Sequence, residues 1–127
     1  MEKTILVDGK EVRMRASALV PRLYRFKFGR DLIQDLMQLR QNFEKAKALP
    51  ADASPEERAA AQLSVLDLTI FENVAYIMAK HGDPQGVPAT IEEWMEGFAL
   101  FSIYEVLPQI LELWDLTNRT TSTAKKN

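Results

Sequence analysis

The segment from Ser102 to Leu116 reads S-I-Y-E-V-L-P-Q-I-L-E-L-W-D-L and is the apolar stretch around which the chain is organised. Its apolar residues cover most of the circumference of a helix: Ile103, Val106, Leu107, Ile110, Leu111, Leu113, Trp114 and Leu116. A helix that lies on a protein surface needs only one apolar face. The segment is therefore predicted to complete the core on one side and to offer its remaining surface to a helical client or a second copy.

The composition around this segment is that of one globular domain. The chain has 127 residues, of which 46% are hydrophobic and 27% charged, which suffices for a core. The absence of cysteine excludes disulfides and thiolate metal sites, and His81 is the only histidine. The sequence shows no signal-peptide pattern and no run near the roughly 18 apolar residues of a membrane span. We therefore expect a cytoplasmic protein that does not enter the membrane.

Charge is distributed unevenly along the chain. Residues 1–30 hold eight Lys/Arg and three acids, a net charge of +5, whereas residues 31–127 hold eight Lys/Arg and fifteen acids, a net charge of −7. The two halves sum to the formal net charge of −2. Such asymmetry favours a basic face that meets an acidic partner, nucleic acid, or the acidic half of another copy.

The N-terminal residues predict a β-hairpin over 3–15. Asp8-Gly9 is typical of a two-residue type I′ turn. In that register Ile5 faces Val12 and Lys3 faces Met14, so that the apolar side chains share one side. Because a lone hairpin is marginal in water, this side must pack on helices or pair with a neighbour.

Five helices are predicted after the hairpin. Helix 19–28 follows Ser17 as a cap and ends at Gly29, and helix 31–48 begins at Asp31. Helix 55–80 begins with Ser54-Pro55 and ends before Gly82. Helices 91–98 and 103–116 each begin with a capping box, Thr90 with Glu93 and Ser102 with Glu105.

Two features complete this outline. Pro108 is predicted to kink or break the last helix. Residues 117–127 contain no apolar side chain larger than alanine and are predicted to form a disordered tail. The fold class is accordingly α+β, a mostly helical single domain over 1–116 with an N-terminal hairpin.

Few side chains in the sequence are candidates for catalysis or metal binding. His81 is predicted to lie near the last carbonyls of its helix, where the dipole favours it, and Glu92, Glu93 and Glu96 are explained as acids at a helix start. The chain contains no phosphate-binding loop, H-E-x-x-H or G-x-S-x-G motif. We expect no catalytic activity, no metal and no cofactor.

Two sets of residues are candidates for binding a partner. One is basic and interleaved with aromatic residues: Arg22, Arg25, Lys27 and Arg30, beside Tyr24, Phe26 and Phe28. Their cations are either solvated or paired with acids in residues 92–115, a segment with six acids and no Lys or Arg. The other set is aromatic and either packs in the core or anchors a partner: Trp94, Phe98, Phe101, Tyr104 and Trp114.

Several stretches taken together resemble a known family. They are the D-G hairpin, P-R-L-Y-R-F-K-F-G-R-D (21–31), F-E-N-V-A-Y-I-M-A-K (71–80), I-E-E-W-M-E-G-F and S-I-Y-E-V-L-P-Q-I-L-E-L-W (within 91–114). This order resembles the small tail assembly chaperones encoded by tailed phages and prophages of Gram-positive bacteria, with siphophage- or myophage-type tails. The likeness covers about residues 3–116 and involves no catalytic motif.

The resemblance implies a non-enzymatic role in the cytoplasm of the bacterial host. Such chaperones bind the helical tape measure protein, keep it soluble and help the tail tube protein to polymerise around it. A domain with opposite charges at its two ends can also stack along a client in multiple copies, as a homo-oligomer. The alternative is a small nucleic-acid-binding regulatory protein that uses the basic segment 13–30.

The resemblance also suggests how the gene is translated. Many of these chaperones are made in two lengths by a programmed ribosomal frameshift near the end of the shorter frame. Lys125-Lys126-Asn127 can be encoded by A-AAA-AAC, a slippery heptamer. The nucleotide sequence decides this, because AAG at Lys125 would remove the site.

Overall fold

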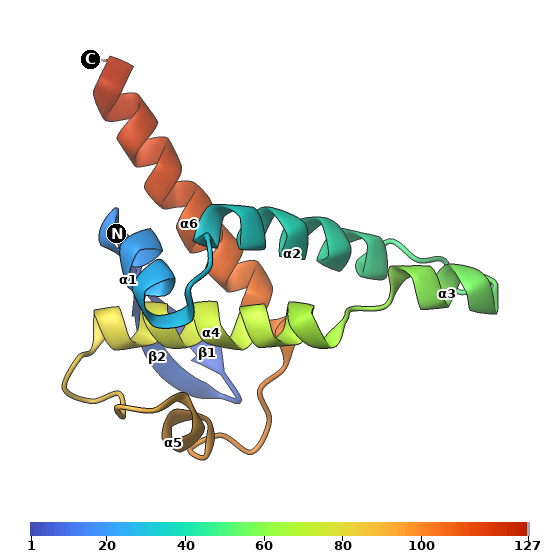
Figure 1. Ribbon diagram of the computed structural model, residues 1–127, viewed down its shortest axis with the longest axis horizontal. Helices are drawn as coiled ribbons and strands as arrows, with labels where there is room; N and C mark the ends of the chain where they lie inside the picture. Colours follow the sequence, from blue (N-terminus) through green and yellow to red (C-terminus); the bar gives the residue numbers. More distant parts are fainter. Residues whose placement is uncertain (127) are drawn as a thin grey trace.

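In the computed structural model, a two-stranded hairpin and six helices form over the described residues. The structure describes residues 1–126, except for the side chains of Ala60 and of 118–126, and it does not describe Asn127. The elements are β1 (Glu2–Val7), β2 (Lys10–Arg15), α1 (Leu19–Phe28), α2 (Leu32–Lys47), α3 (Pro55–Ala61), α4 (Val65–Gly82), α5 (Ile91–Met95) and α6 (Ile103–Lys126). The predicted mostly helical domain with an N-terminal hairpin is confirmed (Figure 1).

The hairpin has the predicted register. β1 pairs antiparallel with β2, with Ile5 opposite Val12 and Lys3 opposite Met14. Asp8 and Gly9 have φ angles of 54° and 75°, as a type I′ turn requires. Ile5, Val7 and Met14 are fully buried, so the hairpin places its apolar side on the helices rather than in water.

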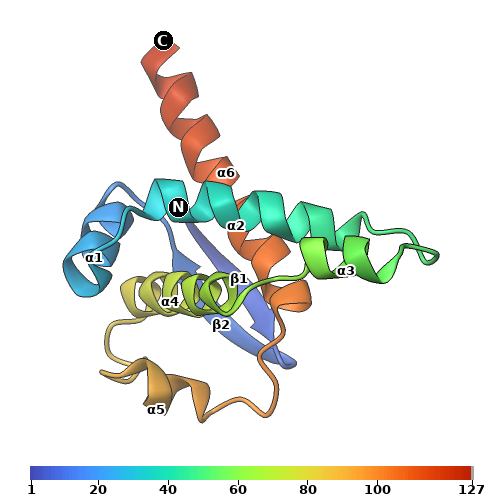
Figure 2. The same cartoon turned by 45° about the vertical axis from the view of Figure 1, so that its right-hand side comes forward.

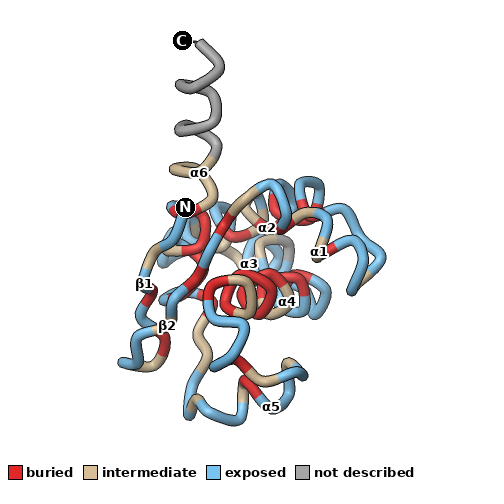
Figure 3. Tube along the Cα trace, turned by 90° about the vertical axis from the view of Figure 1, so that its left-hand side faces the viewer, coloured by how far each residue is buried: buried red, intermediate tan, exposed pale blue. Residues whose placement is uncertain are grey.

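α4 is the central helix of the domain. It contacts β2, α1, α2, α5 and α6, and Figure 3 shows buried residues around most of its circumference. At its end the backbone of β2 approaches closely, since a Cβ added to Gly82 would lie 2.6 Å from the Arg13 carbonyl oxygen. A helix that is apolar on nearly all sides is expected to be buried in this way.

The apolar segment from Ser102 to Leu116 also forms a core helix, the first part of α6. Ile103, Val106, Leu107, Ile110, Leu111 and Leu113 are buried, and Trp114 is partly buried against them. α6 packs on β1 and α4, and Figures 1 and 2 show it passing behind α2. The prediction that one side of this helix completes the core is confirmed, and most of its apolar circumference is used inside the domain.

Side chains of α6 also hold the hairpin. Gln109 accepts a hydrogen bond from the Leu6 amide at 3.1 Å and donates one to the Leu6 carbonyl at 3.0 Å. Glu105 accepts from the Asp8 amide at 2.8 Å, so its carboxylate contacts the hairpin turn. An ion pair of 2.8 Å between Lys3 and Glu112 joins the same two elements.

The long helix predicted over 55–80 was wrong, because the chain forms two helices there. α3 ends at Ala61 and α4 begins at Val65, with a second complete capping box between Ser64 and Asp67. This box satisfies amides that a continuous helix would pair with its own carbonyls. α5 is likewise shorter than predicted and ends at Met95.

The last helix differs from its predicted bounds. Its backbone is helical from Ile103 to Lys126, beyond the end expected at Leu116, and Pro108 lies inside it without breaking it. No glycine or proline follows Pro108 to stop the helix. The predicted disordered tail over 117–127 falls mostly on residues whose side chains lie outside the described part of the chain.

Candidate functional site

α1 presents two apolar stripes to different surroundings. Val20 and Tyr24 are buried in the core, one turn apart. Leu19, Leu23 and Phe26 follow one another at spacings of about one turn on a second face. Phe26 is 88% exposed, which is unusual for a phenylalanine in a folded domain. The second stripe of α1 therefore lacks a cover.

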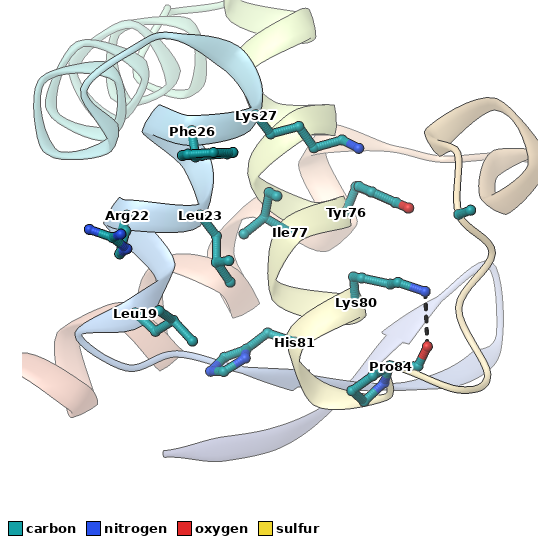
Figure 4. A pocket seen from close by; sticks show the side chains of 11 residues that line it. Leu19, Arg22, Leu23, Phe26, Lys27, Tyr76, Ile77, Lys80, His81 and Pro84 are labelled. Carbon is teal, nitrogen blue, oxygen red and sulfur yellow. Dashed lines mark hydrogen bonds between the residues drawn. The ribbon is translucent and has the colours of Figure 1, made fainter.

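This second stripe faces the C-terminal half of α4 across a groove. The groove has a volume of about 780 Å³. Figure 4 shows Leu23 and Ile77 pointing toward each other across it, with His81 and Leu19 at one end. Its lining is largely apolar, with all the charged side chains basic: Leu19, Arg22, Leu23, Phe26, Lys27, Tyr76, Ile77, Lys80, His81, Pro84 and Ala89.

The basic residues of the groove differ in how firmly they are held. Lys27 lies over the ring of Tyr76, with 5.4 Å between its Nζ and the ring centroid. Lys80 donates to the carbonyls of Pro84 at 2.9 Å and Val87 at 2.7 Å, which fixes the loop after α4. Arg22 is exposed. Lys80 thus shapes the groove, whereas Arg22 is available at its edge.

His81 is hydrogen-bonded at the end of α4. Its Nε2 forms a hydrogen bond of 3.0 Å with the Ser17 hydroxyl, and the Ser17 oxygen accepts from the Leu19 amide at 3.2 Å. Burial lowers the pKa of His81, as do the charges of Arg15 and the N-terminal amino group. The predicted position at the end of a helix is confirmed, but its surroundings disfavour the cation that the helix dipole would favour.

A buried acid anchors α1 to α2. Asp35 accepts from the Tyr24 hydroxyl at 2.7 Å and from Arg30 at 2.8 and 3.0 Å. Burial alone would raise the pKa of Asp35, but the hydrogen bonds from Arg30 and Tyr24 and the Arg30 charge lower it. Burial and Asp35 together raise the pKa of Tyr24. The Tyr24 phenol therefore stays protonated and donates to Asp35, which holds α1 against α2.

The aromatic candidates form a closed cluster on the other side of Tyr76. Trp94 is only 6% exposed and meets Tyr76, Phe98 and Phe101 edge-on at centroid distances of 5.8, 5.3 and 5.4 Å. Phe101 also stacks on Phe71 at 5.0 Å. These rings pack against one another, which is the first of the two alternatives that the sequence left open.

The remaining candidates are placed separately. Tyr104 is exposed and lies 5.6 Å from the ring of Phe43, and Trp114 is partly buried. Arg25 is exposed, whereas Arg30 pairs with Asp35. Between described residues, ion pairs to the acidic segment come from Lys3 and Arg40, which contact Glu112 and Asp115. The structure thus brings Arg22 and Lys27 to the groove and leaves the aromatic set elsewhere.

Sequence reasoning missed most of the apolar groove residues. Phe26 was named only as one of three aromatic residues beside the basic set, of which only Tyr24 is fully buried. The available signal was the number of apolar side chains on this short helix, which exceeds what one stripe can hold. The groove also needs Ile77 and His81 from α4, and their proximity to α1 is a property of the tertiary fold.

The described residues contain no group of three or more His, Asp or Glu arranged to hold a metal ion. Within the same part of the chain, no helix combines the length and apolar character needed to cross a membrane. No protein-family model, curated protein or solved structure matches the chain.

Proposed function

We propose that this protein is a phage tail assembly chaperone, a non-catalytic binding protein of the bacterial cytoplasm. Its client is the tape measure protein, around which the tail tube protein assembles. The supporting observation is that two stretches which carry the family resemblance meet in space. Residues 21–31 include most of α1 and residues 71–80 lie within α4, and these helices form the two walls of the groove.

The groove is suited to holding a client rather than to chemistry. Its lining combines an open apolar surface with cations, and its one histidine is hydrogen-bonded to a serine hydroxyl at 3.0 Å. An exposed apolar surface rimmed by polar residues commonly marks a protein interaction site. Such a surface would shield apolar helical segments of a client from aggregation until tube subunits cover them.

Co-expression with the client tests this proposal. We expect the gene to lie between a tail tube gene and a very long, helix-rich gene, and the latter supplies the client. The full chain should raise the soluble fraction of that client and co-purify with it. A small helical protein of unrelated sequence serves as the control. A client that is equally soluble with the control, and does not co-purify, would contradict the proposal.

A nucleic-acid-binding regulator is the second candidate, and the exposure of Phe26 beside Arg22, Arg25 and Lys27 favours it. Exposed aromatic residues among cations are typical of surfaces that stack bases. The net charge of −2 argues against it, since attraction of phosphates depends on the whole surface. A regulator would bind DNA with an affinity that falls steeply with salt, whereas the chaperone should show no appreciable binding.

A further inference from the structure

The groove leaves part of the second apolar stripe of α1 uncovered. Phe26 is 88% exposed and Leu19 is 44% exposed, and both belong to the same stripe of α1. Across the groove, Tyr76 and Ile77 are buried beneath this surface. An aromatic side chain held at the edge of an apolar channel is the usual form of an interface anchor.

The shape of the groove fits a helix. One wall is a helical stripe that runs from Leu19 through Leu23 to Phe26, and the other runs from Ile77 to His81 and Pro84. The seven steps from Leu19 to Phe26 extend over about 10 Å at 1.5 Å per residue. A helix placed between two helices contacts both with residues spaced i, i+3, i+4 and i+7. The groove therefore matches about two turns of a third helix.

The charge of the groove determines which charge a bound helix should carry on its flank. Every charged residue in the lining is basic, with Arg22 and Lys27 on the α1 side and Lys80 on the α4 side. α1 contains no carboxylate, and Asp35 of α2 is occupied by Arg30 and Tyr24. A partner with acids beside its apolar stripe would meet a complementary surface, whereas a basic partner would be repelled.

From these observations we propose that the groove between α1 and α4 binds an amphipathic helix of a partner protein, with an apolar stripe in the channel and an acidic flank against Arg22. The inference rests on the proposed function, because it assigns a chemistry to the segments of the client that this chaperone binds. Phe26 is the anchor of the complex, and Arg22 selects the charge of the flank.

A synthetic helix tests the proposal directly. The probe is a labelled peptide with leucines at i, i+3, i+4 and i+7 and glutamates on one flank, and its matched control carries lysines at the glutamate positions. Fluorescence anisotropy with the full chain should show binding of the acidic peptide, weakened by added salt. The lysine peptide should bind at least about tenfold more weakly.

Variants of the chain show whether the peptide binds in the groove. Phe26→Ala should weaken binding of the acidic peptide about tenfold or more, and Arg22→Glu should weaken it while improving binding of the lysine peptide. Met37→Ala and Lys45→Glu are the matched controls, because both side chains are exposed on α2 away from the groove. Neither control should change the affinity more than about twofold.

Three results would overturn the proposal. The first is equal binding of the two peptides, and the second is full affinity in the Phe26→Ala variant. The third is self-association that Phe26→Ala abolishes, since a second copy would then be the occupant. A helical circular dichroism spectrum unchanged in each variant shows that the fold is retained in every case.

The peptide-binding test of the groove and the client-solubility test of the proposed function can fail independently of each other. If the wild-type chain keeps the tape measure client soluble and the Phe26→Ala and Arg22→Glu variants do so equally well, the function stands and the groove is not its site. If the wild-type chain fails with the client but binds the acidic peptide in the groove, the inference stands and the proposed client is wrong.

Discussion

Two regions rich in apolar and aromatic residues lie on either side of Tyr76, and they differ in what covers them. On one side Trp94 meets Tyr76, Phe98 and Phe101 within 6 Å of its own ring centroid. On the other side the cation of Lys27 lies over the Tyr76 ring, at 5.4 Å from its centroid, and Phe26 is 88% exposed. The first region is closed by its own chain, whereas the second is open.

The comparison shows why residue type alone did not locate the proposed binding surface. The closed cluster comes from the acidic segment 92–115, whose aromatic side chains fold back onto α4 and onto one another. The open groove comes from the basic segment, whose cations surround an apolar stripe without covering it. Aromatic residues therefore stabilise the domain in one region and remain available for a partner in the other.

The largest expected difference is in stability. Trp94→Ala should lower the free energy of unfolding by about 3–5 kcal/mol, because it leaves a cavity within the closed cluster. Phe26→Ala should change it by about 0.5 kcal/mol or less, because the ring is exposed. Guanidinium unfolding of both variants measures this, with equal m-values as the control for a common unfolded state. Equal losses would mean that Phe26 is covered in solution.

A smaller loss of stability is expected when Asp35, which holds α1 against α2, is replaced. Asp35→Asn should lower the free energy of unfolding by about 1–2 kcal/mol at neutral pH, since it removes the charge that Arg30 and Tyr24 contact. The folded-state pKa of Asp35 is lowered. Its stabilisation is therefore complete above the unfolded-state pKa of about 3.9 and is lost as pH falls through the folded value.

Urea unfolding at several pH values tests this sign. The difference between the wild-type chain and Asp35→Asn should shrink progressively below about pH 4. The Asp31→Asn variant is a control, because Asp31 caps α2 from an exposed position. A difference that grows on acidification would contradict the assigned role of Asp35.

The smallest effect is expected at the end of the groove. The pKa of His81 is lowered in the folded state, so the folded protein favours the neutral imidazole. Stability is then complete above the unfolded-state pKa of about 6.5 and decreases as pH falls below it. His81→Gln should flatten the thermal stability profile between about pH 7 and 5. A wild-type profile that rises on acidification would show the opposite pKa shift.

Local signals in the sequence predicted much of the fold. Asp8-Gly9 gave the hairpin and its register, and Asp31 caps α2 through the amides of Ile33 and Gln34. The break after Ala61 was missed although Ser64 and Asp67 spell a capping box, because the apolar pattern continues across it. Such patterns identify which residues are apolar, but not where a helix is interrupted.

The candidate site was predictable only in part. Arg22 and Lys27 were selected as basic residues of one helix, and both line the groove. Trp94 was selected for its aromatic side chain and is buried. Which side of α1 remains open depends on how α1 rests on α4, and this packing joins residues about fifty positions apart. No pattern within a single helix carries that information.

The side chain of Gln109 has a consequence for how copies of this protein can associate. Its amide group bonds both the N–H and the C=O of Leu6, in the manner of a neighbouring strand. Exposed strand edges readily recruit further strands and lead to aggregation. Because Gln109 already bonds these backbone groups, they are not available to pair with a strand of another newly made chain.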